Sequence, residues 1–509
     1  MRTKVILSLL IPESILTLSL RIFLLTLSAI NNTFNLGGYT MERKSGILLH
    51  VSSLPSNYGI GSLGKSAYDF ADFLAASKQT YWQILPLGPT SKEGSPYNSN
   101  SAFAGNPFLI DLDYLIKNNL INYSDIPISM KKSPSKKVNY KTLNKYRYQV
   151  LKKSYNNLKN KMKEFEEFKR SNSFWLDDYS LYIALKNYFD KLPWYKWPDE
   201  GIKLHQRSSI KKYRSFLEEN IDEISFIQFL FYEQLQNLKT YLNIIGIKLI
   251  GDMPLYVSHD SCDVWSNREL FKLDGNNLPT EVAGVPPDYY SKNGQVWNTP
   301  IYEWDNLNKS NYEWWIKRMS HQLKYVDLLR IDHFRGIESY WSIPYGDITA
   351  KNGHWNKGPG KDLIDVINTN FNKGILLAEN LGLLTNASED LLKYSGYLGM
   401  NVIQFEKNLE RIDNKTVLYT STHDNDTLLG YIKKQNLRES CHDFLLKGSN
   451  SNATMFLASM QDYLELPSKC RMNTPNTVKH NWQWRLKTNE ISETLSSKIS
   501  EITIQGRRT

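Results

Sequence analysis

Cysteine is scarce in this sequence. Only Cys262, Cys441 and Cys470 occur among 509 residues, far apart and without a CxxC pair. A disulfide framework or a structural zinc site needs closely placed ligands, so this usage argues against both and fits the reducing cytoplasm. We therefore predict a cytoplasmic protein whose thiols are buried or incidental.

The sequence also has no GxGxxG pattern and no P-loop, so it suggests no nucleotide cofactor. His333 and His423 each stand beside an aspartate, but neither belongs to a tight ligand pattern. Hydrogen bonding to a polar ligand, or a satisfied buried position, is the more common use of such histidines. We expect neither an essential metal nor a cofactor.

No uninterrupted apolar run reaches the roughly 20 residues that a membrane helix needs. Apolar stretches at residues 5–11 and 15–30 are interrupted by Pro12, Glu13 and Arg21. We interpret residues 1–40 as an N-terminal extension outside the fold. It is either a targeting segment or sequence translated upstream of a start at Met41, and we favour the second. Residues 41–509 then hold the fold, with no membrane association.

Positive charge is in excess, but it is not concentrated in one part of the sequence. Lys and Arg number 62 against 52 Asp and Glu, a net charge of +10, yet the lysines are scattered. Nucleic-acid binding is therefore only weakly supported. The 31 Tyr, 13 Trp and 20 Phe supply flat surfaces that stack on sugar rings or bases as well as fill cores. Composition alone does not choose between these uses.

Short β-rich runs recur along the chain, and most of them end in polar or charged residues. Helical stretches separate them, which is typical of a parallel sheet. Eight such units make a (β/α)8 TIM barrel the economical α/β fold. The eight predicted strands lie within residues 46–55, 81–90, 247–257, 326–334, 374–380, 399–405, 416–424 and 453–460.

The alternation stops between the second and third of these runs. Residues 115–238 are rich in Lys, Glu, Leu and aromatic residues at helical spacing. We expect a large, mostly helical insertion there, with further loop insertions elsewhere. Its charge-dense stretches are typical of solvated loops and helix faces.

Three of the late predicted strands end in a carboxylate: Asp332, Glu379 and Asp424. The carboxyl ends of barrel strands converge on one face, so we expect these side chains to surround one pocket. Two carboxylates there can divide the roles of nucleophile and acid. Arg330 lies on the same side of its strand as Asp332 and would keep that aspartate ionised, as a nucleophile requires. Glu379 follows the apolar "ILLA", which would raise its pKa and suit it to donate a proton.

Taken singly, each of these carboxylates has a simpler interpretation. An aspartate at the end of a strand is more often a helix cap or half of an ion pair. The catalytic hypothesis therefore depends on all three residues meeting in one place.

Seven segments, taken together, resemble those of the amylomaltases, the 4-α-glucanotransferases also called disproportionating enzymes, of the α-amylase clan of retaining glycosidases. The resemblance extends from about residue 44 to about residue 485. The pairing of "VPPD" with "GQVW" is its most diagnostic part. The segments are "SPYNSNSAFAGNP", "GDMPLYVSHDSCDVW", "EVAGVPPDYYSKNGQVW", "LLRIDHFRG", "LLAENLG", "STHDNDT" and "RMNTP".

The resemblance implies roles for the residues that match its motifs. Asp332 would form the covalent glucosyl-enzyme, Glu379 would act as acid and then base, and Asp424 would stabilise the distorted sugar. Further matched positions imply contacts with the same sugar (Arg330, His333, His423 and Asn473), with the donor side (Tyr97, Ser99, Asp252 and Trp297), and a loop covering the cleft (Pro287 and Asp288). For Tyr97 and Trp297, packing in a core or loop is the alternative.

The chain departs from the family pattern at two places. The segment between Asp424 and Gln461 is shorter than the resemblance implies, so we expect a threat to the closure of the barrel at its last strand. After "VIQF", Lys407 and Asn408 follow Glu406, where the family continues with an aromatic and an acidic residue.

The resemblance implies α-1,4-glucans and maltooligosaccharides as substrates, with glucose as an acceptor. An aromatic cleft under a covering loop would favour transfer over hydrolysis, because it holds an acceptor and limits water. An α-amylase-like hydrolase and a non-catalytic glucan-binding protein are the alternatives, and a nucleic-acid binder is weaker still. The sequence leaves the oligomeric state open between a monomer and a small homo-oligomer.

Overall fold

The computed structural model describes residues 42–132, 136–288 and 291–509. The predictions for residues 1–40 and for a start at Met41 lie outside the described residues. Residues 43–509 form one compact unit. No helix in the described part of the chain is long and apolar enough to span a membrane.

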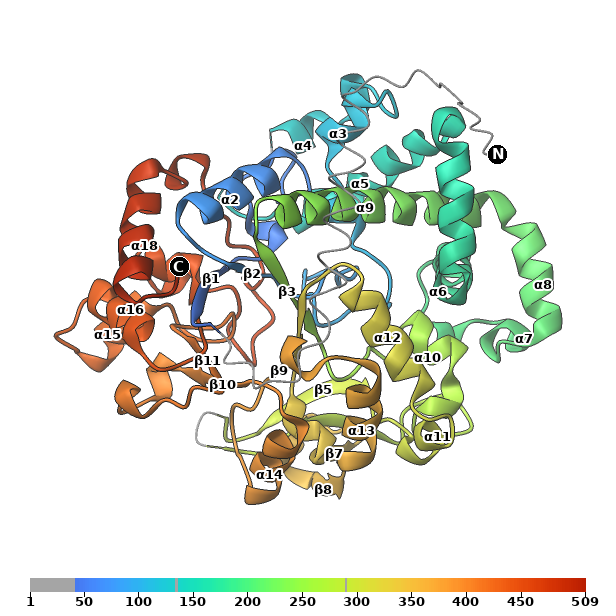
Figure 1. Ribbon diagram of the computed structural model, residues 1–509. Coiled ribbons are helices and arrows are strands. Elements are labelled where there is room, and N and C mark those ends of the chain that lie inside the picture. The colour runs from blue at the N-terminus through green and yellow to red at the C-terminus, as the bar shows by residue number, and fades with distance from the viewer. Residues whose placement is uncertain (1–41, 133–135, 289–290) are drawn as a thin grey trace, which may run out of the picture. The chain divides into compact units, whose positions relative to one another are not determined.

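Eight parallel strands form the central sheet (Figure 1). Six of the seven pairings join barrel strands that follow one another in the chain, and the seventh joins the last strand to the first. A parallel bridge between Leu377 and Leu398 brings the two ends of the sheet together. The predicted (β/α)8 barrel is therefore confirmed. Seven strands fall within their predicted runs, and β1 begins two residues before its run. The strands are β1 (Lys44–Leu48), β2 (Tyr81–Gln83), β3 (Lys248–Met253), β6 (Leu328–Ile331), β9 (Leu376–Ala378), β10 (Gly399–Val402), β11 (Thr416–Tyr419) and β12 (Met455–Ser459).

Helices surround this sheet. Between β10 and β11 the chain instead makes two short 3-10 turns, Ile403–Phe405 and Leu409–Arg411. The helices are α2 (Lys65–Ala76), α3 (Leu112–Lys117), α4 (Ile128–Lys131), α5 (Tyr140–Tyr155), α6 (Met162–Tyr188), α7 (Glu200–Lys203), α8 (Arg207–Phe216), α9 (Glu218–Ile244), α10 (Cys262–Ser266), α11 (Trp304–Lys309), α12 (Glu313–Leu323), α13 (Lys361–Asn370), α14 (Asn386–Ser395), α15 (Leu428–Gln435), α16 (Cys441–Asn450), α17 (Met460–Tyr463) and α18 (Glu493–Gln505).

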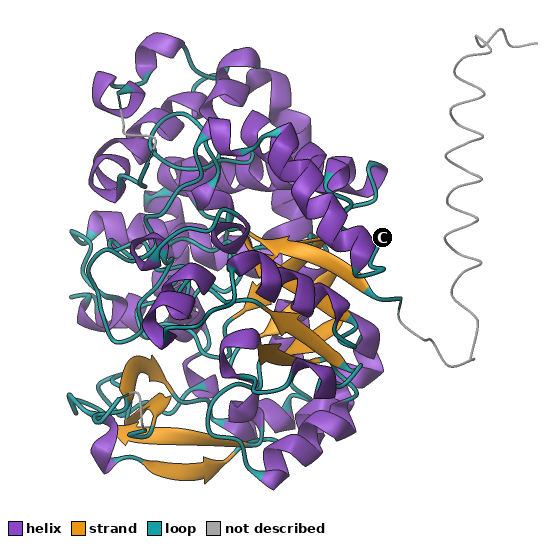
Figure 2. Cartoon of the chain, turned by 90° about the vertical axis from the view of Figure 1, so that its left-hand side faces the viewer, coloured by secondary structure: helices purple, strands orange, loops and turns teal. Residues whose placement is uncertain are grey.

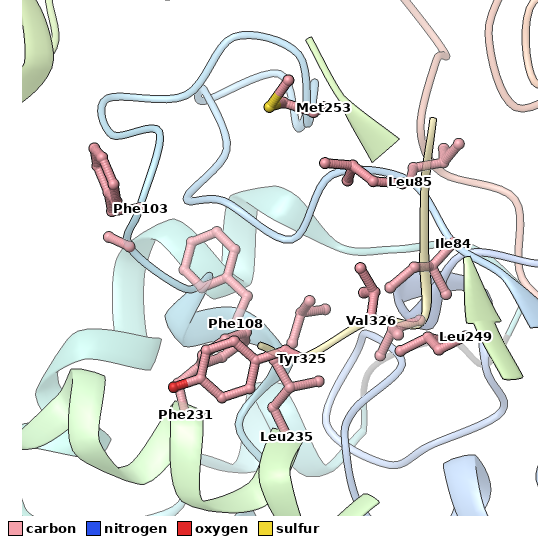
Figure 3. Packing of buried hydrophobic residues seen from close by; sticks show 14 of the residues in the cluster. Ile84, Leu85, Phe103, Phe108, Phe231, Leu235, Leu249, Met253, Tyr325 and Val326 are labelled. Atoms are coloured by element: carbon pink, nitrogen blue, oxygen red, sulfur yellow. The ribbon is translucent and has the colours of Figure 1, made fainter. Parts of the chain in front are cut away.

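The predicted helical insertion follows β2 and comprises α3 to α9. Its longest contact with the barrel is made by α9, which runs directly into β3. Figure 3 shows Phe231 and Leu235 of α9 packed near Tyr325 and Val326, which lead into β6. All four side chains are less than 10% exposed, so the insertion shares one hydrophobic core with the outside of the barrel.

A second sheet lies apart from the barrel, as the two groups of strands in Figure 2 show. It contains β4 (Glu281–Val285), β5 (Gln295–Pro300), β7 (Ser339–Pro344) and β8 (His354–Lys357), paired antiparallel in the order β5-β4-β7-β8. The predicted covering loop is the connection between β4 and β5.

The barrel closes at its last strand. β12 pairs with β11 on one side and with β1 on the other, and α15 and α16 both form in the shortened segment before it. The expectation that this shortening threatens closure is therefore wrong. α18 contacts α16 and α2, so the end of the chain packs across the seam between the last and first strands (Figure 1).

The strands alternate between two hydrophobic layers, as the side-chain period of two requires. Leu328, Val417 and Met455 belong to a cluster made up mainly of residues from the barrel strands, whereas the next residues along the chain, Leu329, Leu418 and Phe456, belong to the large core shared with the helices. The first set therefore fills the barrel interior. This alternation decides which residues face the interior at the ends of the strands.

Candidate active site

The polar residues at the carboxyl end of the barrel continue the interior columns of apolar side chains. In β3, Ile250 lies in the interior cluster and Asp252 follows two residues later. In β6, Leu328 is followed at the same spacing by Arg330 and then Asp332, and Glu379 stands two residues after Leu377. Because every second residue of a strand faces the same way, these charged groups converge above the apolar side chains that fill the barrel interior.

Arg330 joins two of these carboxylates. Its side chain is 5% exposed, and Nη1 lies 2.7 Å from Oδ1 of Asp252 and 2.8 Å from Oδ1 of Asp332. Burial opposes the charge of the guanidinium, but Asp252 and Asp332 outweigh it and raise the pKa of Arg330 well above its usual value. The predicted contact between Arg330 and Asp332 is present. Asp252 is a partner that the spacing of the sequence could not reveal.

Asp252 is enclosed by protein on all sides. Its side chain is 0% exposed, and its second oxygen, Oδ2, accepts a hydrogen bond of 2.6 Å from the hydroxyl of Tyr97. Burial raises the pKa of Asp252, and Arg330 opposes that shift. In this structure Asp252 therefore contacts Tyr97 and Arg330, and it orients both.

Glu379 lies beside the turn that follows Asp332. Its Oε2 accepts a hydrogen bond of 2.8 Å from the backbone N–H of His333, and Oε1 accepts one of 2.9 Å from Leu381. His333 adopts a left-handed conformation with φ 50°, which is uncommon for a residue with a side chain. Burial raises the pKa of Glu379 to about 7, with a further contribution from Asp332, while Arg330 opposes the shift. The raised pKa predicted from the apolar approach is confirmed.

Asp424 stands on the loop after β11 and is held from several directions. Asn473 Nδ2 donates to Oδ1 at 2.6 Å, His423 Nε2 lies 3.3 Å from Oδ2, and Arg471 donates to the backbone carbonyl at 2.7 Å. Burial would raise the pKa of Asp424, but His423 and Asn473 lower it well below its usual range. The side chain is nevertheless 47% exposed, so the carboxylate is accessible to a ligand.

Aromatic rings flank the carboxylates on two sides. Tyr97 stacks on His423 with ring centroids 5.0 Å apart, which places the segment after β2 against the loop of Asp424. Trp297 of β5 meets His333 edge-on at 4.8 Å, which ties the second sheet to the end of β6. Burial lowers the pKa of His333 to about 4, so this ring is neutral at pH 7.

The remaining predicted residues lie in loops. Ser99 donates to the carbonyl of Ser101 at 2.9 Å and lines a cavity with Tyr97 and Asp252. Pro287 is exposed, and Asp288 accepts a hydrogen bond of 2.6 Å from the N–H of Ser291 within the connection between β4 and β5.

Sequence reasoning missed several residues that shape the site. Arg471 stands in "RMNTP", two residues before Asn473, and holds the carbonyls of both Asp424 and Asn473. Gln404 donates to the carbonyl of Asp426 at 2.7 Å, and Asp462 binds both ends of the Asp424 loop. Asp462 lies three residues after the last strand, so a search of the polar residues near strand ends could have found it.

The described part of the chain contains no group of three or more His, Cys, Asp or Glu side chains arranged to hold a metal ion. The three cysteines are unpaired. The polar groups that this arrangement offers to a ligand are carboxylates, amides, imidazoles and one guanidinium. Such a set can bind sugar hydroxyls and exchange protons with them.

Comparison with known proteins gives one consistent result. The family model described as 4-alpha-glucanotransferase matches residues 49–491. A 4-alpha-glucanotransferase of Clostridium butyricum is 42% identical over 486 residues, covering 90% of this chain and 100% of that protein. One of Streptococcus pneumoniae is 40% identical over 494 residues, covering 92% of this chain and 98% of that protein.

Solved structures agree with the sequence comparison. The amylomaltase from Streptococcus agalactiae in complex with acarbose superimposes with a TM-score of 0.88 at 36% identity, covering 92% of this chain and 100% of that one. The amylomaltase from Corynebacterium glutamicum gives a TM-score of 0.74 at 15% identity, covering 91% of this chain and 75% of that one, and so supports the fold alone.

Proposed function

The chain belongs to the 4-alpha-glucanotransferase family, and from that premise we propose how its residues carry out transfer between glucans. The enzyme moves an α-1,4-glucan segment from a donor to the 4-hydroxyl of an acceptor glucose or maltooligosaccharide, by a retaining double displacement. The observation that supports this most strongly is the meeting of Asp332 and Glu379 around His333. The backbone N–H next to one carboxylate binds the other at 2.8 Å.

In the first step Asp332 attacks the anomeric carbon of the donor. Arg330 holds Oδ1 at 2.8 Å, so we assign the attack to Oδ2. The bond from the anomeric carbon to the glycosidic oxygen breaks as the bond to Oδ2 forms, and Glu379 gives its proton to the departing oxygen. A pKa of about 7 keeps a large share of Glu379 protonated at neutral pH, as a general acid requires.

In the second step the acceptor reverses this chemistry. Glu379, now a carboxylate, removes the proton from the acceptor's 4-hydroxyl, and that oxygen attacks the anomeric carbon. The bond to Asp332 breaks, and Asp332 leaves as a carboxylate that Arg330 again stabilises. Two inversions at one carbon give net retention.

The other residues hold the sugars. Asp424 is ionised and faces the cleft, so it can accept hydrogen bonds from sugar hydroxyls that strengthen in the transition state. We assign contacts with the same sugar to Arg330, His333, His423 and Asn473, and contacts with the donor side to Tyr97, Ser99, Asp252 and Trp297. Asp252 acts there through Tyr97 and Arg330, because its own side chain is enclosed. Pro287 and Asp288 belong to the loop that we assign to covering the cleft.

We further propose that the enzyme works in the cytoplasm, in the metabolism of glycogen, starch or maltose, without a metal or cofactor. The two oxygens that perform the chemistry both come from protein carboxylates, so the mechanism calls for neither. A monomer or small homo-oligomer would suffice, because the residues assigned to the reaction lie in one chain.

The test is incubation of the purified protein with maltotriose, followed by measurement of both glucose and longer maltooligosaccharides. Transfer predicts glucose together with maltotetraose and longer products. Glucose and maltose alone would indicate a hydrolase. Unchanged maltotriose with retained glucan binding would indicate a binding protein, and either outcome would overturn the proposal.

A further inference from the structure

Asp462 is a buried carboxylate outside the proposed catalytic set. Asp462 lies in α17, three residues after the end of β12, and is 0% exposed. In residues 42–132, 136–288 and 291–509, no salt bridge with a lysine or arginine includes it; four hydrogen bonds satisfy it instead. Burying an unpaired carboxylate is costly unless every lone pair is used, so its surroundings are specific.

The four donors come from three different elements. Oδ2 accepts from the hydroxyls of Thr420 at 2.6 Å, Ser421 at 2.5 Å and Ser459 at 3.0 Å. Oδ1 accepts from the backbone N–H of Leu428 at 2.7 Å. Thr420 and Ser421 leave β11, Ser459 ends β12, and Leu428 begins α15. One carboxylate therefore joins two strand ends to the start of a helix.

These contacts enclose the loop that carries Asp424. Ser421 immediately precedes residues 422–427 and Leu428 immediately follows them, so Asp462 binds the chain on both sides of the loop. Within the loop, Asn473 and Arg471 hold Asp424, and Gln404 holds the carbonyl of Asp426. Those bonds fix the middle of the loop, whereas Asp462 fixes the distance between its ends.

We propose that Asp462 is a positioning residue for Asp424, and that its carboxylate sets where Asp424 stands in the proposed sugar-binding site. This inference rests on the proposed function, in which Asp424 stabilises the transition state. Asp462 touches no sugar itself and acts only through the loop.

A carboxylate fits this site because the Leu428 N–H and the Thr420 hydroxyl donate to it, while the hydroxyls of Ser421 and Ser459 also contact each other and share their protons with Oδ2. An asparagine has one acceptor oxygen and an NH2 group that only donates. The backbone N–H of Leu428 cannot turn, so the amide oxygen must take the Oδ1 position. The NH2 group would then face the three hydroxyls, which can rotate to accept but cannot all be satisfied by two N–H bonds. Asp462→Asn therefore keeps the size of the side chain and loosens one end of the loop.

The experiment compares Asp462→Asn with Asp327→Asn and with the wild type, using initial rates on maltotriose. Asp327 is the matched control, because it accepts from the N–H of Leu249 and from Lys239 at the opposite end of the strands. We expect kcat of Asp462→Asn to fall roughly 10- to 100-fold with little change in KM, since small displacements of a catalytic group cost about this much. The Asp327 variant should lose thermal stability and keep its kcat.

Two results separate positioning from a merely structural role. In an Asp424→Asn background, Asp462→Asn should lower kcat no further, because the group it positions is already disabled; additive losses would overturn the inference. Thr420→Val removes one hydroxyl donor and keeps the shape of the side chain. It should lower kcat by a smaller factor than Asp462→Asn, and this loss should also vanish in the Asp424→Asn background. It serves as the test if Asp462→Asn does not fold.

The outcomes also distinguish the inference from the function beneath it. If the wild type turns over maltotriose and Asp462→Asn does so equally fast, the inference fails and the proposed function stands. If the wild type makes no maltooligosaccharide longer than maltotriose, the proposed function fails and the inference fails with it.

Discussion

The raised pKa of Glu379 gives the proposed mechanism a measurable signature in pH. Burial and Asp332 raise this pKa from the ordinary 4.5 to about 7. At pH 7 about half of the free enzyme then carries the proton that the leaving oxygen needs, whereas a carboxyl of ordinary pKa would be protonated in only about 0.3% of molecules. We expect kcat/KM for maltotriose to fall about tenfold for each pH unit above the pKa.

The assay follows glucose release from maltotriose and fluoride release from α-maltosyl fluoride, a second donor, in stopped samples between pH 5 and pH 9. Fluoride leaves without a proton, so its kcat/KM should lack the alkaline fall that maltotriose shows. This comparison isolates Glu379 from other groups that titrate in the same range. A kcat/KM for maltotriose that stays level from pH 6 to pH 9, or an alkaline fall shared by both donors, would refute the assignment of Glu379 as the acid.

The same shift predicts a change of stability with a definite sign. Between pH 4.5 and about 7 the unfolded chain releases the proton of Glu379 while the folded chain keeps it, so the free energy of unfolding falls as pH rises. The loss amounts to at most about 3 kcal/mol. Glu379→Gln removes this pH dependence, so its thermal midpoint relative to that of the wild type should be higher at pH 8 than at pH 4.5. Equal differences at both pH values would contradict this account.

Three further outcomes follow from particular contacts. Trp297→Ala removes the ring that meets His333 at 4.8 Å and should raise KM for maltotriose roughly 2- to 10-fold, while Trp297→Phe keeps most of the affinity in the same rate assay. Arg508→Met removes a buried guanidinium that donates to the carbonyls of Ser449, Ser451 and Lys44 across the barrel seam, and should lower unfolding stability by about 3 kcal/mol in differential scanning fluorimetry with kcat unchanged. EDTA should leave the transfer rate unchanged, because protein carboxylates supply both nucleophile and acid in the proposed mechanism; a rate restored only by added metal would contradict this.

Local patterns were enough to predict the barrel and much of the site. A buried strand that ends in a polar cluster is a signal contained within ten residues, and most of the eight strands carry it. The contact between Arg330 and Asp332 follows from the period of two, and the raised pKa of Glu379 follows from the apolar residues before it. Such inferences succeed because the residues that determine the feature lie close in sequence to the residue that shows it.

The rest depends on residues that only the closed barrel brings together. Tyr97 stacks on His423 across more than 300 residues, and nothing near either one indicates the other. Counting residues in the segment after Asp424 predicted a weakened closure, yet β12 finds both neighbours and the C-terminal helix α18 packs against α16 and α2. Length alone says little about closure, because packing from the end of the chain contributes to it.

Exposure separates two aspartates that sequence cannot rank. Asp252 and Asp332 both end a buried strand, and both place Oδ1 within 2.8 Å of the same nitrogen of Arg330. Asp252 is 0% exposed and its second oxygen is taken by Tyr97, so no anomeric carbon can reach it. Asp332 is 26% exposed, and Arg330 engages only its Oδ1. One guanidinium thus contacts a carboxylate that orients its neighbours and the carboxylate that we propose as the nucleophile, and only the second is open to a ligand.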